Sequence, residues 1–76
     1  MKIYGYQEAD VENDGLLQLE EITIQASPVT LKQIAQFLID SANAMDAHGE
    51  KFGHEHFNDF MQKIGKYTGP DIIVSK

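Results

Sequence analysis

The chain has 76 residues, of which 12 are acidic and six are basic, so its formal charge is −6. A chain of this length supports one domain, expected to span residues 1–76, with one modest core. It is too short for a two-domain enzyme with separate cofactor and substrate domains. The sequence has no cysteine and no apolar run longer than three residues. We therefore expect no disulfide, no thiolate metal site, no membrane span and no signal peptide, and a reducing compartment suits the chain.

The charge distribution narrows the class of partner. All six cations are lysines and arginine is absent, whereas a nucleic-acid-binding face is basic and commonly uses arginine. Six of the twelve acids lie in a segment that contains no cation: Glu8, Asp10, Glu12, Asp14, Glu20 and Glu21. Such a segment repels polyanions and attracts basic surfaces, with a strength that falls as salt rises. We therefore expect no nucleic-acid partner, and the segment is either a solvated face or a surface for a basic protein.

The first predicted elements form a hairpin. Residues 2–6 favour a strand, and the polar connection that follows ends at the turn signal Asp14-Gly15. Residues 16–25 return to strand composition, but their apolar alternation shifts by one between Leu19 and Ile22. This shift predicts either a bulge between these two residues or two apolar pairs that point to different faces. We expect the two strands to be joined by a loop longer than a tight turn.

Ser27-Pro28 begins the best-defined element. A serine side chain at the N-cap accepts an otherwise unpaired backbone N–H, and proline fits the first helical position. Apolar residues then recur at spacings of three and four before the stop signal Gly49: Leu31, Ile34, Ala35, Leu38, Ala42 and Met45. Phe37 and Ile39 flank this stripe and widen it, so we expect a helix over about residues 28–47 that packs on a sheet face.

The segment after Gly49 fits two patterns. Phe57 and Phe60 have helical spacing, whereas His54 and His56 alternate as on a strand. We expect a short helix near residues 55–64, preceded by extended backbone. Residues 71–75 contain three consecutive β-branched residues, typical of a strand that is buried on both faces or lies centrally in a sheet. The elements together predict an α+β fold, with a small antiparallel or mixed sheet of three to four strands packed on one long helix.

Two segments carry patterns found in metal sites. Residues 10–21 place acids and a glycine as a calcium loop does, but their flanks are strand-like, and an EF-hand needs helices there. His54 and His56 would share one side of a strand and could hold a metal together, whereas on a helix they would diverge. The alternative is that one histidine hydrogen-bonds inward and the other is exposed. We expect no cofactor and no metal, and His54 with His56 remain the alternative metal ligands.

Nothing in the sequence indicates catalysis. Ser27 is explained as a helix cap, no cysteine can act as a nucleophile, and no glycine-rich loop can hold a phosphate. We therefore expect that the protein is not an enzyme. Most of the seven aromatic residues should lie in the core. Any aromatic left exposed beside the histidines would mark an interface, with another protein or with a second copy in a homodimer.

From Leu19 onward the chain combines a strand that runs into a capped helix, a Gly-His-x-His segment and a final apolar strand. The residues are Leu19-Glu20-Glu21-Ile22-Thr23-Ile24, Ser27-Pro28, Ile34-Ala35-Gln36-Phe37-Leu38, Ala42, Met45, Phe52-Gly53-His54-Glu55-His56-Phe57, Asp59 and Pro70-Asp71-Ile72-Ile73-Val74. In this order they resemble the immunity protein 32 family of bacterial polymorphic toxin systems. The resemblance implies a cytoplasmic, non-catalytic α+β protein that binds and neutralises a cognate toxin, frequently a nuclease.

The predicted partner-binding residues come from two sources. Acidic residues would attract a basic toxin domain, and residues of the resemblance would contact the toxin or hold the fold. They are Glu8, Asp10, Glu12, Asp14, Gly53, His54, His56 and Asp71. Two alternatives stay open, a small metal-binding domain that uses His54 and His56, and a homodimeric structural domain.

Overall fold

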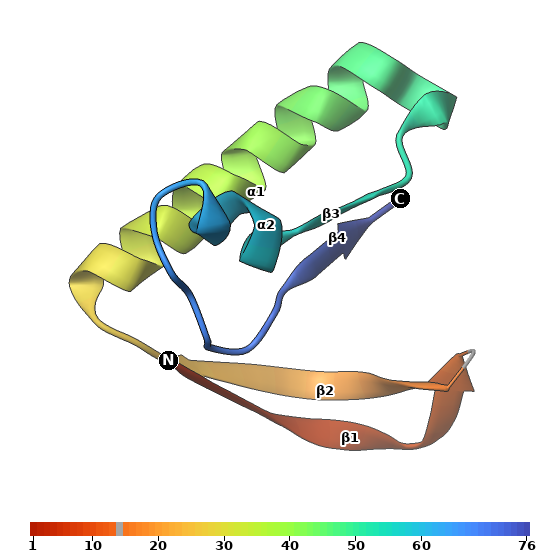
Figure 1. Cartoon of the computed structure of the whole chain (residues 1–76). Coiled ribbons are helices and arrows are strands. Elements are labelled where there is room, and N and C mark those ends of the chain that lie inside the picture. Colours follow the sequence, from red (N-terminus) through yellow and green to blue (C-terminus); the bar gives the residue numbers. More distant parts are fainter. Residues whose placement is uncertain (14) are drawn as a thin grey trace.

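The computed structural model describes residues 1–13 and 15–76, and only the backbone for residues 9–13. Within these residues the order of elements is β1 (Lys2–Asn13), β2 (Leu16–Gln25), α1 (Pro28–His48), the 3-10 helix η1 (Gly49–Lys51), β3 (His54–His56), α2 (Phe57–Gln62) and β4 (Ile73–Ser75) (Figure 1). The α+β class, the long helix and the short second helix are confirmed. The four strands form two separate antiparallel pairs, β1 with β2 and β3 with β4, rather than one sheet.

The hairpin of β1 and β2 contains the predicted bulge. Tyr6 lies opposite Glu21, but the next residue of β1, Gln7, lies opposite Leu19, so Glu20 is the extra residue. The connection is shorter than expected, because β1 ends at Asn13 and β2 begins at Leu16.

One face of the hairpin is apolar, because directly opposed residues point to the same side of a sheet. Ile3 lies opposite Ile24, and Ile22 lies opposite Gly5. A Cβ added to Gly5 would lie 2.7 Å from Leu19 Cδ1, so the Leu19 side chain covers this glycine. The bulge thus places Leu19 on the same side as Ile22, and we define the apolar face as Ile3, Leu19, Ile22 and Ile24.

The opposite face of the hairpin is aromatic and polar. Tyr4 lies opposite Thr23, and Tyr6 lies opposite Glu21. We define these four residues as the tyrosine face. Tyr4 and Tyr6 have 54% and 69% of their surface exposed, whereas the sequence pattern placed most aromatic residues in the core.

Helix α1 begins and ends at the predicted residues. The Ser27 hydroxyl accepts a hydrogen bond from the Thr30 N–H at 3.2 Å, Pro28 occupies the first turn, and Gly49 ends the helix with a φ of 54°. The buried face coincides only in part with the predicted stripe. It consists of Ile34, which belongs to the stripe, Phe37, which flanks it, and Ser41.

The outer part of the predicted stripe stays exposed, because the aromatic core lies on the Phe37 side of the helix. Leu31 and Leu38 are 45% and 46% exposed, and Ala35 and Ala42 are exposed as well. We call these four residues the exposed helix stripe. The stripe runs along α1 beside its buried face.

The core is built around Phe57, which is fully buried. Its ring lies 5.4 Å from that of Phe37, 6.0 Å from that of Phe60 and 5.5 Å from that of Tyr67, measured between centroids. Phe52 is also buried and Phe60 is partly buried. All three phenylalanines of residues 52–60 therefore point inward, because Phe52 precedes the helix, and none is left exposed beside the histidines.

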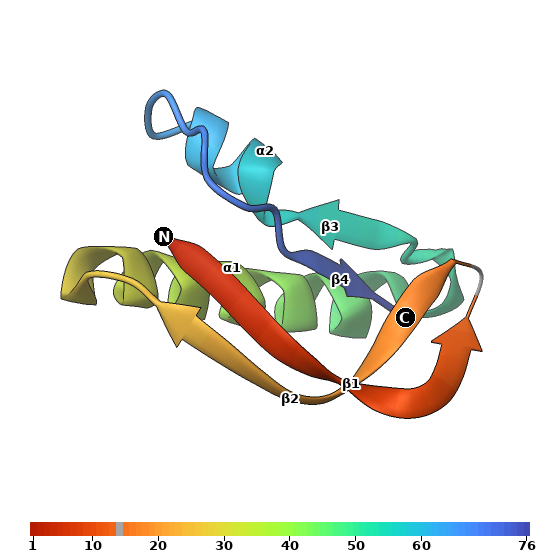
Figure 2. The same cartoon turned by 90° about the horizontal axis from the view of Figure 1, so that it is seen from below.

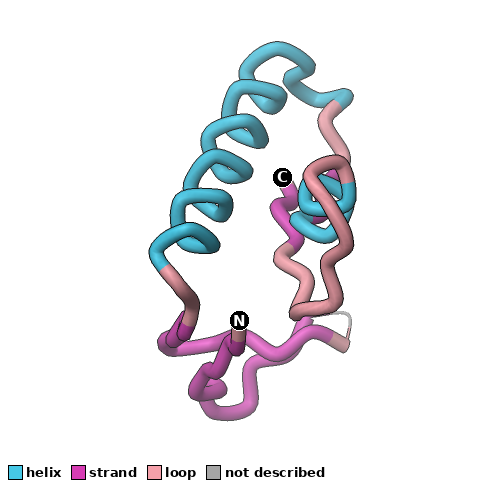
Figure 3. Tube along the Cα trace, turned by 60° about the vertical axis from the view of Figure 1, so that its left-hand side comes forward, coloured by secondary structure: helices cyan, strands magenta, loops and turns pink. Residues whose placement is uncertain are grey.

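The short strands β3 and β4 and helix α2 lie along one side of α1, and the hairpin lies across one end of this unit (Figures 2 and 3). Met1 at the start of the hairpin is partly buried against the core. β4 pairs with β3 alone among the described strands, and Ile73 is 57% exposed. The expectation that the last strand is buried on both faces or lies centrally in a sheet is therefore wrong, since only Ile72 and Val74 contact the core.

Candidate partner-binding surface

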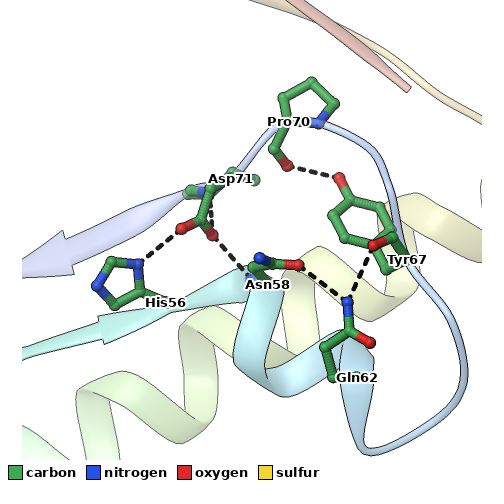
Figure 4. Close-up of polar contacts among 7 residues, drawn as sticks. His56, Asn58, Gln62, Tyr67, Pro70 and Asp71 are labelled. Carbon is green, nitrogen blue, oxygen red and sulfur yellow. Dashed lines mark hydrogen bonds and ion pairs between the residues drawn. The ribbon is translucent and has the colours of Figure 1, made fainter.

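Asp71 ties three segments of the C-terminal half together (Figure 4). Its Oδ2 accepts a hydrogen bond from His56 Nδ1 at 2.6 Å, and its Oδ1 accepts from the backbone N–H of Asn58 at 2.8 Å and of Ile72 at 2.9 Å. The Asn58 N–H belongs to the first turn of α2, which has no cap from its own His56 side chain. Asp71 therefore caps α2 from 13 residues away.

The His56–Asp71 pair shifts the pKa of both groups. The hydrogen bond and charge of Asp71 raise the pKa of His56 above its usual 6.5, against a smaller opposing effect of burial. Burial opposes ionisation of Asp71, but its hydrogen bonds from His56, Asn58 and Ile72 outweigh this effect and lower its pKa below 3.8. Both side chains keep about a third of their surface exposed, at 34% and 32%. The pair therefore forms a charged contact at the surface in mildly acidic solution.

The loop between α2 and β4 is fixed by a second group of polar contacts. Gln62 Nε2 donates to Asn58 Oδ1 at 3.2 Å and to the Tyr67 carbonyl at 2.9 Å, and the Tyr67 hydroxyl donates to the Pro70 carbonyl at 2.6 Å. Burial and the charge of Asp71 raise the pKa of Tyr67. These contacts tie the segment that presents Asp71 to helix α2.

His54 and His56 lie on the same side of the β3–β4 pair as Ile73 and Ser75, and we call this side the outer side. They lie at alternate positions of β3 with ring centroids 5.0 Å apart. The strand pattern therefore holds for both histidines, and the short helix expected near residues 55–64 begins only at Phe57. With Asp71, Ile73 and Ser75 of the C-terminal segment they line an open hollow that also includes Leu16 of the hairpin. The structure therefore brings three of the predicted site residues together.

A metal site at these histidines gains no third ligand from the described part of the chain. Within residues 1–8 and 15–76, no group of three or more histidine or carboxylate side chains is placed to hold a metal ion. Asp71 contacts His56 Nδ1, so the free ring atom of His56 is Nε2. Gly53, which precedes His54, has no positive φ, and a Cβ added there would meet no atom within 4 Å. Nothing in the structure explains why residue 53 is glycine.

The acidic residues are only partly described. The side chains of Asp10, Glu12 and Asp14 lie outside the described residues. Glu8 is exposed, and its Oε2 accepts a hydrogen bond from Gln18 Nε2 at 2.7 Å across the hairpin. Glu20 and Glu21 are also exposed.

Among the side chains that the structure describes, lysines do not pair with the acidic residues. Among the described side chains the one ion pair joins His56 to Asp71, and no lysine lies within 4.0 Å of a carboxylate oxygen. A hollow of about 180 Å³ between α1, β3 and α2 also has an excess of negative charge. Three carboxylates and one lysine are among the residues that line it: Asp40, Glu55, Asp59 and Lys63. The negative charge is thus free to act on a partner.

The tyrosine face is the part of the surface that sequence reasoning missed. A shallow hollow there is lined by Tyr4, Gly5, Tyr6 and Thr23. Tyrosine supplies apolar area together with a hydroxyl, a combination enriched at protein interfaces. Lys2, Tyr4, Tyr6 and Glu8 lie at every second position and so share one side of a strand. This pattern indicates that the tyrosines are exposed, because a side that faces the core would not begin and end with a charged residue.

One of the comparisons with known proteins finds a match. The sequence model described as Immunity protein 32 matches residues 21–75, from the middle of β2 to the end of β4. No curated protein and no solved structure matches the chain. Among the described residues, no helix has both the length and the apolar composition needed to cross a membrane. The matched residues make up well over half of the sequence, and the chain therefore belongs to the immunity protein 32 family.

Proposed function

We propose that this chain is an immunity protein that neutralises a cognate toxin by direct protein–protein binding and carries out no reaction itself. The family match over residues 21–75 is the observation that carries this proposal. The toxin is a basic protein domain, such as a nuclease, and the two proteins meet in the cytoplasm of the cell that makes both. The family match leaves the contact surface open, and we propose a surface from the exposed residues.

Charge supports a basic partner. The chain carries −6, and the described carboxylates are free of lysine partners. Opposite charges on two proteins accelerate their encounter, and this acceleration weakens as salt screens the charges. An enzyme that cuts nucleic acid must itself bind phosphates with basic residues. An acidic chain of this size therefore suits the nucleic-acid-binding face of such a toxin.

The tyrosine face supplies the contacts that charge alone does not. Tyr4 and Tyr6 are more than half exposed, and Glu21 lies directly opposite Tyr6. Glu8 lies two residues beyond Tyr6 along β1 and is exposed. Aromatic side chains that become buried in a complex provide a large share of its binding energy, with charges around them acting on rate and specificity. We propose that the toxin binds this face, and that the negative charge of the predicted acids Asp10, Glu12 and Asp14 also attracts the toxin.

The outer side of β3 and β4 belongs to the proposed surface as a second region. His54 is exposed there and His56 is held by Asp71. In this proposal His54 contacts the toxin, whereas His56 and Asp71 position the strands beneath it. A His54→Ala variant should then weaken binding while the thermal unfolding temperature stays close to that of the unchanged protein.

Co-purification with the toxin domain encoded beside this gene tests the proposal. Both proteins are produced together, with the toxin inactivated at its catalytic residues, and the complex is captured through a tag on the toxin. We expect capture of the immunity protein at equal stoichiometry. Absence of a complex at low salt would contradict the proposed function.

Paired charge variants test the proposed surface. In Glu8→Gln with Glu21→Gln, two carboxylates are neutralised on the hairpin, and the Gln side chain at residue 8 can still contact Gln18. The matched control, Asp46→Asn with Glu50→Gln, removes the same charge at the distal end of α1. We expect slower association and a weaker salt dependence for the hairpin variant only. Equal effects of both pairs would show that net charge acts without a defined face.

A further inference from the structure

The chain exposes more surface than its mass allows for a compact monomer. Its solvent-accessible area is 5952 Å², whereas a compact protein of 8.5 kDa exposes about 4,650 Å². The radius of gyration is 13.7 Å, compared with about 11.4 Å for a compact domain of this length. The excess area is about 1,300 Å², which exceeds the roughly 800 Å² that each partner buries in a standard interface.

Part of the exposed area consists of two apolar patches, one on the hairpin and one on α1. On the apolar face of the hairpin, Leu19, Ile22 and Ile24 are 44%, 56% and 37% exposed. An isolated two-stranded hairpin is at best marginally stable in water, so this face requires a covering layer. The rest of the chain covers little of this face. Among the described residues, all buried side chains belong to α1, α2 and the segment before β3, and none belongs to the hairpin.

The exposed helix stripe is the second place. Leu31, Ala35, Leu38 and Ala42 follow one another at spacings of four, three and four, which is the repeat that packs one helix against another element. Leu31 and Leu38 are nearly half exposed. Neither the stripe nor the apolar face contains a charged residue.

We propose that a second copy of this chain covers the apolar face of the hairpin and the exposed helix stripe, forming a two-fold symmetric homodimer. Symmetry allows both patches of each copy to enter one interface, since each contact is made twice. If each copy buries the excess of about 1,300 Å², the dimer interface totals about 2,600 Å², which is the size class of stable homodimers.

The charge distribution favours a second copy over a basic toxin at these two patches. A highly charged partner would leave charges facing isoleucine and leucine side chains, which costs free energy. A second copy instead brings uncharged apolar side chains together and leaves the tyrosine face, with Glu21, on the outside. Because two copies of charge −6 repel each other, added salt should strengthen the dimer, opposite to its effect on toxin binding.

Sedimentation equilibrium of the full chain without toxin tests the proposal. We expect a mass of twice 8.5 kDa, with dissociation on dilution and tighter association between about 0.05 M and about 0.5 M NaCl. A mass of one chain at every concentration and salt would overturn the proposal. This outcome is independent of toxin capture, so the homodimer and the immunity function can fail separately.

Three variants with the same added charge locate the interface. Ile22→Glu places the charge on the apolar face, Leu38→Glu places it on the exposed helix stripe, and Thr23→Glu is the control, because residue 23 is next in sequence but belongs to the tyrosine face. We expect monomers from the first two and a dimer from Thr23→Glu, with unchanged circular dichroism spectra. Dimers from both Ile22→Glu and Leu38→Glu, or a monomer from Thr23→Glu, would overturn the assignment of these patches. If one of the first two variants does not fold, the other still decides the outcome.

Discussion

Replacing Phe57 by alanine tests whether the aromatic cluster is the centre of this fold. The side chain is fully buried, and its ring contacts those of Phe37, Phe60 and Tyr67 at centroid distances of 5.4 to 6.0 Å. Removing a buried phenylalanine ring costs about 3–5 kcal/mol, because transfer free energy is lost and a cavity remains. A chain of 76 residues has a total stability of about 4–11 kcal/mol. Phe57→Ala should therefore lose roughly a quarter or more of the free energy of unfolding.

Urea unfolding followed by circular dichroism measures this loss, at one fixed protein concentration because association would add to stability. The matched control is Tyr6→Ala, which also truncates an aromatic side chain but at a position that is 69% exposed. We expect the control to change the free energy of unfolding by less than about 0.5 kcal/mol. A loss below about 1 kcal/mol for Phe57→Ala would show that the core is not organised around this ring.

Three further substitutions test local features. Gly69→Ala should destabilise the fold by about 1–3 kcal/mol in urea unfolding, because a Cβ would lie 2.5 Å from the Tyr67 hydroxyl and force the ring away; an unchanged midpoint would contradict this. Ser27→Ala should cost about 1 kcal/mol through loss of the N-cap, and a loss seen equally for Ser75→Ala would argue against a specific cap. Asp71→Asn keeps the cap oxygen but removes the charge that raises the pKa of His56. The variant should be less stable than the unchanged protein at pH values between the pKa of Asp71, which is below 3.8, and the pKa of His56, which is above 6.5. The difference should shrink at lower pH, where Asp71 loses its charge, and at higher pH, where His56 loses its charge. A difference independent of pH would contradict an ion pair.

The helix ends could be predicted because local residues determine them. The Ser27 cap, Pro28 in the first turn and Gly49 at the end all follow from backbone hydrogen bonding within a few residues. The bulge at Glu20 was predictable for the same reason, since it leaves a shift in the apolar alternation of a single strand.

The buried face of α1 could not be predicted in the same way. Leu31 and Leu38 are as apolar as Ile34 and have equally regular spacing, so the pattern alone does not distinguish an inner from an outer stripe. The choice is made by Phe57, which comes 20 residues after Phe37 and packs against its ring. Such a contact depends on the chain path after the helix, which no local pattern contains.

In the candidate site, too, local contacts could be predicted from the sequence and distant contacts could not. His54 and His56 could be placed together as soon as the strand pattern was chosen. The contact between His56 and Asp71 spans 15 residues and depends on the loop after α2, so its role in capping that helix was not visible in the sequence. The expectation that most aromatic residues lie in the core did not single out Tyr4 and Tyr6, although these two share one side of β1 with the charged residues Lys2 and Glu8.

Titration of toxin activity tests the central claim that this chain acts by binding and not by catalysis. A fixed amount of the cognate toxin domain is mixed with increasing amounts of the purified chain, and the remaining toxin activity is measured after different times. We expect activity to fall linearly and to vanish at one immunity protein per toxin, with no further change over time. Progressive inactivation of the toxin by a small fraction of one equivalent would contradict the account, because it would require each chain to act on many toxin molecules.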